Sequence, residues 1–140
     1  MQMTRKTDYA LRIMRAVGEN NATGHPISVR AISEQENVPY QFARRISYDL
    51  ANADLIKVTR GARGGAVLSK AADKITLQEI VEVGQGQPIC SRCSLGEDWC
   101  ENESSCNIKR TLEELDDIVI EYLSRIKLSD LLRDEANSAS

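Results

Sequence analysis

The residues with the clearest capacity for chemistry are the four cysteines of this 140-residue chain. They lie within a 17-residue stretch with the spacing C-x2-C-x6-C-x5-C: Cys90, Cys93, Cys100 and Cys106. In a cytosolic protein, clustered thiols more often bind a metal or sense redox state than form stable disulfides. Because thiolate sulfur is a soft donor, this cluster favours zinc or an iron–sulfur cluster.

The spacing leaves three uses of these thiols open. A structural zinc ion would take all four cysteines in a closed tetrahedron, whereas an iron–sulfur cluster could take three of them and another donor. A thiol–disulfide switch is the third use, and Cys90 and Cys93 are then the obvious pair.

The surroundings of the thiols argue against an enzyme. Four acidic residues flank them and only Arg92 opposes this charge: Glu97, Asp98, Glu101 and Glu103. An acidic environment disfavours the thiolate that a nucleophile would need. The single histidine, His25, is far away in the sequence, and no phosphate-binding or hydrolase motif is present. We therefore expect a non-enzymatic protein.

Charge divides the chain into a basic and an acidic part. Residues 1–75 carry 12 Lys and Arg against 7 Asp and Glu, a formal charge of +5. Residues 76–140 carry 6 against 14, a formal charge of −8, within a total of −3. The basic part predicts a polyanionic partner. Without a membrane-length apolar run or a signal-like start, we expect a cytoplasmic protein and no membrane partner.

The basic part has the pattern of a helix-turn-helix. Ser28 can cap a helix over 29–36, a turn follows at 37–39, and a second helix is expected over about 39–53. Four side chains of the second helix are expected to face the core: Phe42, Ala43, Ile46 and Leu50. Its other face would enter the major groove and carries Tyr40, Gln41, Arg44, Arg45 and Tyr48.

Two further elements flank this motif. An amphipathic helix precedes it, with Thr7 as the expected N-cap and an earlier start as the alternative. After the motif, the pattern of residues 56–59 and 66–68 predicts the strands of a β-hairpin with a basic, glycine-rich tip over 60–65. A hairpin directly after a helix-turn-helix is the wing of a winged-helix domain, and its arginines could reach a narrow minor groove.

The acidic part contains two predicted helices. Thr76 and Glu79 form a capping box that begins a short helix. After residues 85–106, a heptad stripe predicts a long helix over about 109–128. The stripe consists of Leu112, Leu115, Val119, Tyr122 and Ile126. Packing against its own domain is one way to bury this stripe, but we favour a homodimer.

Together these motifs resemble the IscR/NsrR/CymR family of bacterial winged-helix regulators. The resemblance runs in order over about residues 1–132, and its most specific segments are residues 4–12, 27–32, 61–65, 75–77 and 126–131, with three spaced cysteines. It implies a homodimer crossed by the long helices that binds a pseudo-palindromic operator in double-stranded DNA, usually as a repressor. It further implies a [2Fe-2S] or [4Fe-4S] cluster that changes DNA affinity when it senses iron, redox state or nitric oxide.

The resemblance assigns three cluster ligands: Cys93, Cys100 and Cys106. Cys90 is additional. One branch of the family uses a histidine three residues after the last cysteine, but Lys109 stands at that position here. Another branch uses an aspartate of the partner subunit's first helix, which matches Asp8. Asp8 and Cys90 are therefore competing candidates for the fourth ligand.

The expected DNA-binding residues depart from the family at two positions. Many relatives carry glutamate in place of Arg44 and a large aromatic in place of Ala66. Glutamate accepts from cytosine whereas arginine donates to guanine, so we expect a different operator preference, with Arg44 and Tyr40 reading bases. Six basic residues are expected at phosphates or the minor groove: Arg45, Lys57, Arg60, Arg63, Arg5 and Lys6. Gln41, Tyr48 and Ser28 complete the expected DNA face.

The sequence thus predicts a mainly α-helical protein with a small β-hairpin. We expect a winged helix-turn-helix DNA-binding domain over 1–84, a cysteine-rich cofactor loop over 85–106, a dimerisation helix over 107–132 and a disordered tail over 133–140. The predicted function is transcriptional repression controlled by an iron–sulfur cluster. The alternative is a DNA-binding regulator with a structural four-cysteine zinc site or a thiol–disulfide switch.

Overall fold

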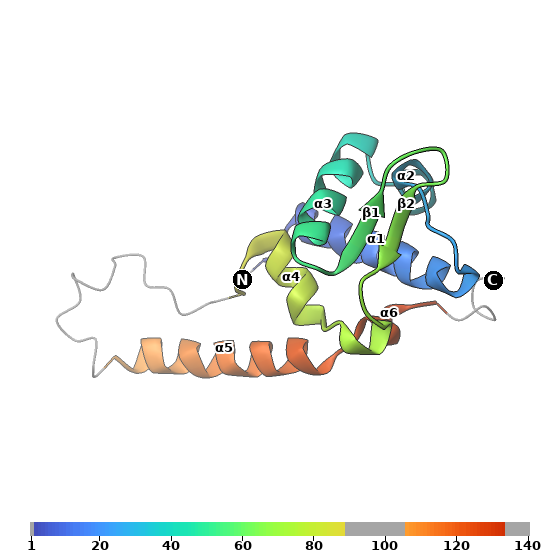
Figure 1. Cartoon of the computed structure of the whole chain (residues 1–140). Coiled ribbons are helices and arrows are strands. Elements are labelled where there is room, and N and C mark those ends of the chain that lie inside the picture. The colour runs from blue at the N-terminus through green and yellow to red at the C-terminus, as the bar shows by residue number, and fades with distance from the viewer. Residues whose placement is uncertain (1, 89–105, 134–140) are drawn as a thin grey trace.

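The computed structural model describes residues 2–88 and 106–133 (Figure 1). Cys90, Cys93, Cys100 and the predicted tail from residue 134 onward lie outside the described residues. The elements in chain order are α1 (Arg5–Asn20), η1 (Asn21–Thr23), α2 (Val29–Glu36), α3 (Tyr40–Asn52), β1 (Ile56–Thr59), β2 (Gly65–Leu68), η2 (Ala72–Lys74), α4 (Leu77–Gln85), α5 (Asn107–Arg125) and α6 (Leu128–Leu131). No helix of the described ranges is both long and apolar enough to span a bilayer.

Helix α1 begins before Thr7, which is the alternative that the sequence left open. Its N-cap is Thr4, whose hydroxyl accepts a hydrogen bond from the backbone N–H of Thr7 at 3.1 Å. Thr7 is instead buried inside the first turn, where its hydroxyl donates to Oε1 of Gln85 at 2.7 Å. A Cβ at Gly84 would overlap Thr7, so α1 and α4 approach closely at this point. This packing, which a local pattern does not reveal, decides which threonine caps the helix.

The helix-turn-helix is confirmed. Ser28 caps α2 by accepting a hydrogen bond from the N–H of Ala31 at 3.0 Å, and Asn37 in the left-handed region closes that helix. Helix α3 turns a stripe inward that consists of Ala43, Ile46, Ser47 and Leu50. The prediction that Phe42 faces inward is wrong, because its side chain is 55% exposed and its ring lies 6.0 Å from that of Tyr9. The buried stripe passes through position 47 rather than position 42.

Helix α1 runs through the centre of the core and contacts α2, α3, α4 and β2. The largest fully buried side chains come from α1, α2, α3, β1, α4, α6 and the segments beside them. They include Ile13, Met14, Ile32, Ile46, Leu50, Leu55, Ile56, Ile75, Ile80 and Leu128. The helix-turn-helix and the hairpin are therefore held on a single aliphatic core that also includes the C-terminal helix α6.

The predicted hairpin is also confirmed. Strands β1 and β2 are antiparallel, with Ile56 opposite Leu68 and Thr59 opposite Gly65. The start of β2 is held against the segment before α2, because Ile27 and Ala66 exchange two backbone hydrogen bonds of 3.1 and 2.7 Å. This bridge fixes the wing relative to the helix-turn-helix.

Gly65 is expected to be essential for that bridge. Its φ is +153°, and a Cβ there would overlap the backbone carbonyl of Ile27. We expect Gly65→Ala to lower the free energy of unfolding by about 2–4 kcal/mol in urea denaturation. Gly61→Ala is the matched control, because Gly61 also has a positive φ, +107°, but nothing lies within 4 Å of its Cβ position. Equal losses for the two variants would contradict this account of the bridge.

The predicted long helix is divided into two. Helix α5 begins at Asn107 and ends at Arg125, after which Ile126 and Lys127 are extended. The break arises because this extended segment forms backbone hydrogen bonds with the start of α4, from the N–H of Leu77 to the carbonyl of Ile126 and from the N–H of Leu128 to the carbonyl of Ile75, at 2.9 and 2.8 Å. Figure 1 shows α5 projecting along one side of the molecule, with α3 at the opposite side.

The end of the described chain is fastened to α1 by an ion pair between Arg133 and Glu19. Hydrogen bonds from Arg133 lower the pKa of Glu19, against a smaller opposing effect of burial. A carboxyl whose pKa is lowered by folding stabilises the fold above its unfolded pKa, and this stabilisation is lost as pH falls through the folded pKa. The difference in Tm between the protein and Glu19→Gln should therefore be full near neutral pH and shrink as pH falls below 4.5, the ordinary value. Glu34→Gln, an exposed change on α2, should show no such trend.

Candidate nucleic-acid interface

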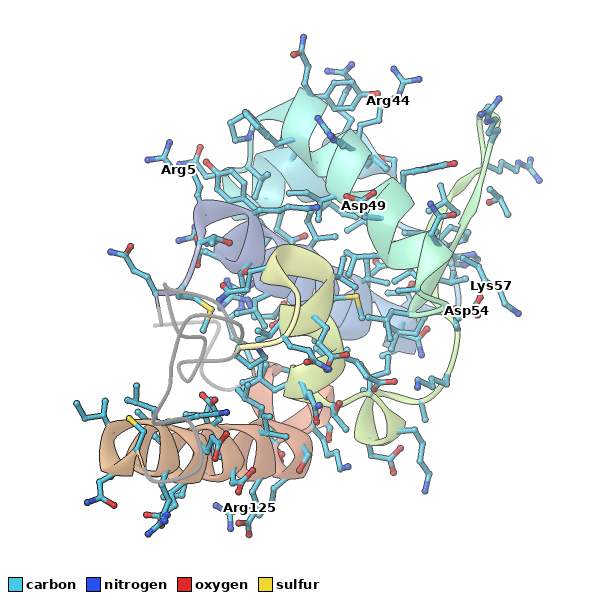
Figure 2. All side chains as sticks on the ribbon, turned by 90° about the vertical axis from the view of Figure 1, so that its left-hand side faces the viewer. Arg5, Arg44, Asp49, Asp54, Lys57 and Arg125 are labelled. Atoms are coloured by element: carbon cyan, nitrogen blue, oxygen red, sulfur yellow. The ribbon has the colours of Figure 1, made fainter. Side chains whose placement is uncertain are left out.

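The outward face of α3 carries the side chains predicted to enter the major groove. All five are exposed: Tyr40, Gln41, Arg44, Arg45 and Tyr48. Figure 2 shows Arg44 pointing away from the body of the protein at one edge of the molecule. The buried stripe of α3 packs the helix against the core, so the backbone that carries these exposed side chains is held in place.

The hairpin presents its cations beside this helix. Lys57, Arg60 and Arg63 are all exposed, and Figure 2 shows the hairpin projecting next to α3 with Lys57 on its outer side. Within the described residues, no ion pair occupies these three cations, nor Arg44 or Arg45. The structure therefore gathers five cations on α3 and the wing that have no carboxylate partner within the described ranges.

The N-terminal cations differ from each other. Arg5 is exposed at the start of α1, as Figure 2 shows. The ammonium of Lys6 instead lies 3.0 Å from the carboxylate of Asp49 on α3. This ion pair links α1 to α3 and gives Lys6 a structural contact in addition to its predicted phosphate contact.

Sequence reasoning missed one residue of this surface. The guanidinium of Arg30, on the first turn of α2, lies 4.3 Å from the centroid of the Tyr40 ring at the start of α3. A cation over an aromatic face is held by the ring quadrupole, so Arg30 and Tyr40 orient each other. The turn over residues 37–39 brings these two positions together. Arg30 was visible as a basic residue in the motif, but its contact with Tyr40 depends on the angle between the helices.

The cysteine segment joins α4 to α5, and one of its thiols lies within the described residues. Cys106 is the N-cap of α5, is partly exposed and has a free thiol. The described ranges contain no group of three side chains able to hold a metal, and the other three cysteines lie outside them.

The start of the cysteine segment lies beside the N-terminus. Oε1 of Gln85, the last residue of α4, accepts from the N–H of Thr4 at 3.0 Å, and its amide donates to the carbonyl of Gln2 at 3.1 Å. Asp8, on the first turn of α1, pairs with Arg12 at 3.0 Å within its own helix. The elements that carry Asp8, Arg5 and the entry to the cysteine segment are thus hydrogen-bonded to one another.

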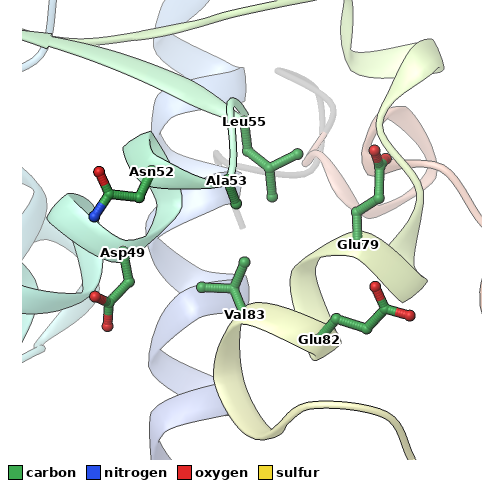
Figure 3. A pocket seen from close by; sticks show the side chains of 7 residues that line it. All are labelled: Asp49, Asn52, Ala53, Leu55, Glu79, Glu82 and Val83. Atoms are coloured by element: carbon green, nitrogen blue, oxygen red, sulfur yellow. The ribbon is translucent and has the colours of Figure 1, made fainter.

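A separate hollow of about 570 Å³ lies between the end of α3 and α4 (Figure 3). Its acidic residues are Asp49, Glu79 and Glu82, and Leu55 and Val83 contribute apolar surface. Burial opposes ionisation of Glu79, but hydrogen bonds from Lys70 and from the backbone of Thr76 outweigh it and lower its pKa. Three carboxylates make this hollow a poor site for a phosphate, although Asp49 is paired with Lys6 and Glu79 with Lys70.

Comparison with known proteins agrees with this geometry. The family model Rrf2, described as "Iron-dependent Transcriptional regulator", matches residues 3–134. The HTH-type transcriptional regulator IscR of Photorhabdus laumondii is 26% identical over 96% of this chain and 81% of its own length. The HTH-type transcriptional repressor NsrR of Streptomyces coelicolor is 24% identical over 94% and 88%.

A solved structure provides the comparison of folds. That of CymR, the global cysteine regulator of B. subtilis, superposes with a TM-score of 0.75 and 32% identity over 94% of this chain and 95% of its own. This similarity confirms the predicted winged-helix fold. The matched relatives are named as transcriptional regulators, in agreement with the prediction of a non-enzymatic protein.

Proposed function

Since the chain belongs to the Rrf2 family of transcriptional regulators, we propose that it represses transcription as a homodimer bound to a pseudo-palindromic DNA operator. The observation that carries this proposal is the set of exposed cations on α3 and the wing. A helix in the major groove with a wing beside it is the geometry by which winged-helix proteins read DNA. Arg44 and Tyr40 would contact bases, and the other cations would contact phosphates or the minor groove.

The homodimer is supported by the surface of α5. Several large apolar side chains of this helix are exposed: Ile108 at 73%, Ile118 at 64%, Tyr122 at 53% and Leu115 at 43%. A row of apolar side chains on a projecting helix needs a partner, and a second copy of the same helix is the simplest one. Of the predicted seam, Leu112, Val119 and Ile126 are half-buried in one copy.

We further infer that the cysteine segment holds an iron–sulfur cluster. Its donor set is suitable, because three or four soft thiolates lie within one short segment and Cys106 stands at a helix N-terminus. Cys93, Cys100 and Cys106 would hold the cluster with Asp8 of the partner or Cys90. When bound, it would supply a group whose oxidation state and assembly respond to iron, redox state or nitric oxide. The surplus fourth thiol favours a zinc site with four cysteine ligands as the second candidate.

The connection between this segment and the DNA-binding surface would carry the signal. Gln85 bonds to Thr4 and Thr7, and Arg5 and Lys6 lie between those two residues. A ligand that binds differently in two states of the dimer must change DNA affinity by that difference. We propose that the protein is located in the cytoplasm, because its DNA partner is found there.

The proposal is tested by selection from a random-sequence pool of duplex DNA with the full-length protein. We expect enrichment of a sequence with two inverted half-sites about one helical turn apart, or a multiple of it. Sedimentation of the protein with the selected duplex should give two chains per duplex. Failure to enrich any sequence over the starting pool would refute operator binding, and enrichment of a single half-site would refute the dimer.

The wing is expected to contribute to the salt dependence of binding. Each phosphate contact that is lost reduces the slope of log Kobs against log salt by about 0.9, so Arg63→Ala should reduce it by about 1.8 in a dimer. Fluorescence anisotropy with the selected duplex between low and moderate salt measures the slope. Arg110→Ala, which removes an exposed charge from α5, is the control. If Arg63→Ala leaves both slope and affinity unchanged, the wing does not contact DNA.

A further inference from the structure

The C-terminal end of the described chain lies on the helices of the DNA-binding domain. Leu128, in α6, is fully buried, and a Cβ on Gly18 of α1 would come within 2.8 Å of Cδ2 of Leu132. The backbone of Ile126 and Leu128 is hydrogen-bonded to the segment before α4. The position of α6 is therefore set on one side by α1 and on the other by residues 75–77, through contacts that do not involve the side chain of Arg133.

Arg133 adds polar contacts to two helices, α1 and α2. Its backbone N–H and its Nε donate to Oε1 of Glu19 at 2.8 and 2.9 Å, and one terminal nitrogen donates to Oε2 at 2.9 Å. The same terminal nitrogen donates to Oε1 of Glu36 at 3.2 Å. The side chain of Arg133, at the end of the described chain, thus connects α1 and α2.

Glu36 makes this contact unusual. It is the last residue of α2, its side chain is only 3% exposed, and its other carboxylate oxygen accepts from Arg15 at 2.7 Å. Asn37, directly after it, is in the left-handed region with φ of 52°, and α3 begins at Tyr40. A buried carboxylate is stabilised by its hydrogen-bond donors. Loss of one donor therefore changes the geometry of the hydrogen bonds that remain. Arg133 consequently bonds to the residue from which the turn of the helix-turn-helix departs.

We propose that Arg133 is a positioning residue for operator recognition. It fastens the segment after α6 to Glu36, at the start of the turn between α2 and α3. It thereby fixes how that turn and the recognition helix α3 are oriented relative to α5 and α6, which other contacts hold in place. In the proposed homodimer, that orientation sets the separation of the two recognition helices and hence the half-site spacing that the protein accepts. This inference rests on the proposed function.

The test compares full-length wild type with Arg133→Ala on three kinds of duplex. These are the operator selected by the wild type, the same operator with its half-sites one base pair closer or further apart, and a single half-site. We expect Arg133→Ala to bind the selected operator about five- to tenfold more weakly and to lose its preference over the respaced operators. Binding to the single half-site should stay within about twofold of the wild type, because the recognition helix itself is unchanged.

Two variants separate positioning from net charge and from folding. Arg133→Lys keeps the charge but loses the forked contact with both carboxylates, so it should show the relaxed spacing of Arg133→Ala. Arg110→Ala removes an equal charge from α5 and should keep the spacing preference of the wild type. All variants should remain folded dimers in thermal unfolding and sedimentation, because α6 is held by Leu128 and by backbone hydrogen bonds.

The outcomes that would overturn the inference are distinct from failure of the proposed function. If Arg133→Ala retains the spacing preference of the wild type, Arg133 does not position the helices. If Arg133→Ala weakens binding to the single half-site and the full operator equally, Arg133 acts on the recognition helix alone or touches DNA. A wild type that selects no two-half-site sequence refutes the proposed function itself.

Discussion

Arg44→Ala is expected to abolish most of the preference for the selected operator over unrelated DNA. A bidentate contact from arginine to guanine contributes about 1–3 kcal/mol of discrimination, and a homodimer makes the contact twice. The expected loss of discrimination is therefore about 2–6 kcal/mol, or roughly 30-fold to more than 10⁴-fold. The measurement is competition between labelled operator and unlabelled random duplex at one fixed salt concentration, since affinity for DNA depends steeply on salt.

Arg45→Ala is the matched control for Arg44→Ala. The two arginines are neighbours on α3, both are exposed, and each substitution removes one positive charge. We expect Arg45→Ala to weaken binding to operator and random duplex by a similar factor, as loss of a phosphate contact does. If Arg44→Ala behaved in the same way as Arg45→Ala, Arg44 would not read a base. Arg44→Glu should further move the preferred base pair at the contacted position from guanine towards cytosine.

Removal of the proposed iron–sulfur cluster from the cysteine segment (residues 85–106) is expected to change operator affinity about 5- to 150-fold, the usual range of coupling between two sites. Protein purified without oxygen should absorb between about 300 and 600 nm and contain matching amounts of iron and sulfide. Cys106→Ser should lose this absorption, and its operator affinity should equal that of chelator-treated wild type. It should not change further on treatment with chelator.

Cys90→Ser distinguishes the possible donor sets. If the ligands are Cys93, Cys100, Cys106 and Asp8 of the partner, Cys90→Ser keeps iron and sulfide and Asp8→Ala loses them. Colourless wild type with one zinc per chain, zinc lost in Cys90→Ser and equal operator affinity with and without the metal would instead establish a structural zinc site with four cysteine ligands. An operator affinity that follows added reductant or oxidant in metal-free protein would indicate the thiol–disulfide switch.

The helix-turn-helix, the wing and the start of α4 could be predicted because they are determined by residues close together in the chain. Ser28 caps α2 through the N–H of a residue three positions ahead, and Thr76 with Glu79 forms the reciprocal capping box that the structure contains. The hairpin tip depends on glycines only a few residues apart. The entropic cost of closing such short loops is small, so these interactions form with little dependence on the rest of the fold.

The predictions that the structure corrects all depend on contacts between elements, which a local sequence pattern does not contain. Thr7 and Gln85 are 78 positions apart in the chain, and the contact between them buries Thr7 and leaves Thr4 as the cap. Phe42 lies beside rather than in the buried stripe, because the packing of α3 against the core selects Ser47 instead. A heptad pattern continues through Ile126, yet the helix ends at Arg125 because Ile75 and Leu77 bind the backbone that follows.

The sequence by itself determined the chemistry that this protein can offer: clustered soft thiols, a basic N-terminal part and the local motifs of a winged helix. It did so because residue type and short spacing are read directly from the chain. Only the tertiary structure decided which side chains act together, such as Arg30 with Tyr40, Lys6 with Asp49 and Arg133 with the buried Glu36. Those pairs form because one aliphatic core brings α1, α2, α3 and α6 into contact, and its packing acts on all four elements at once.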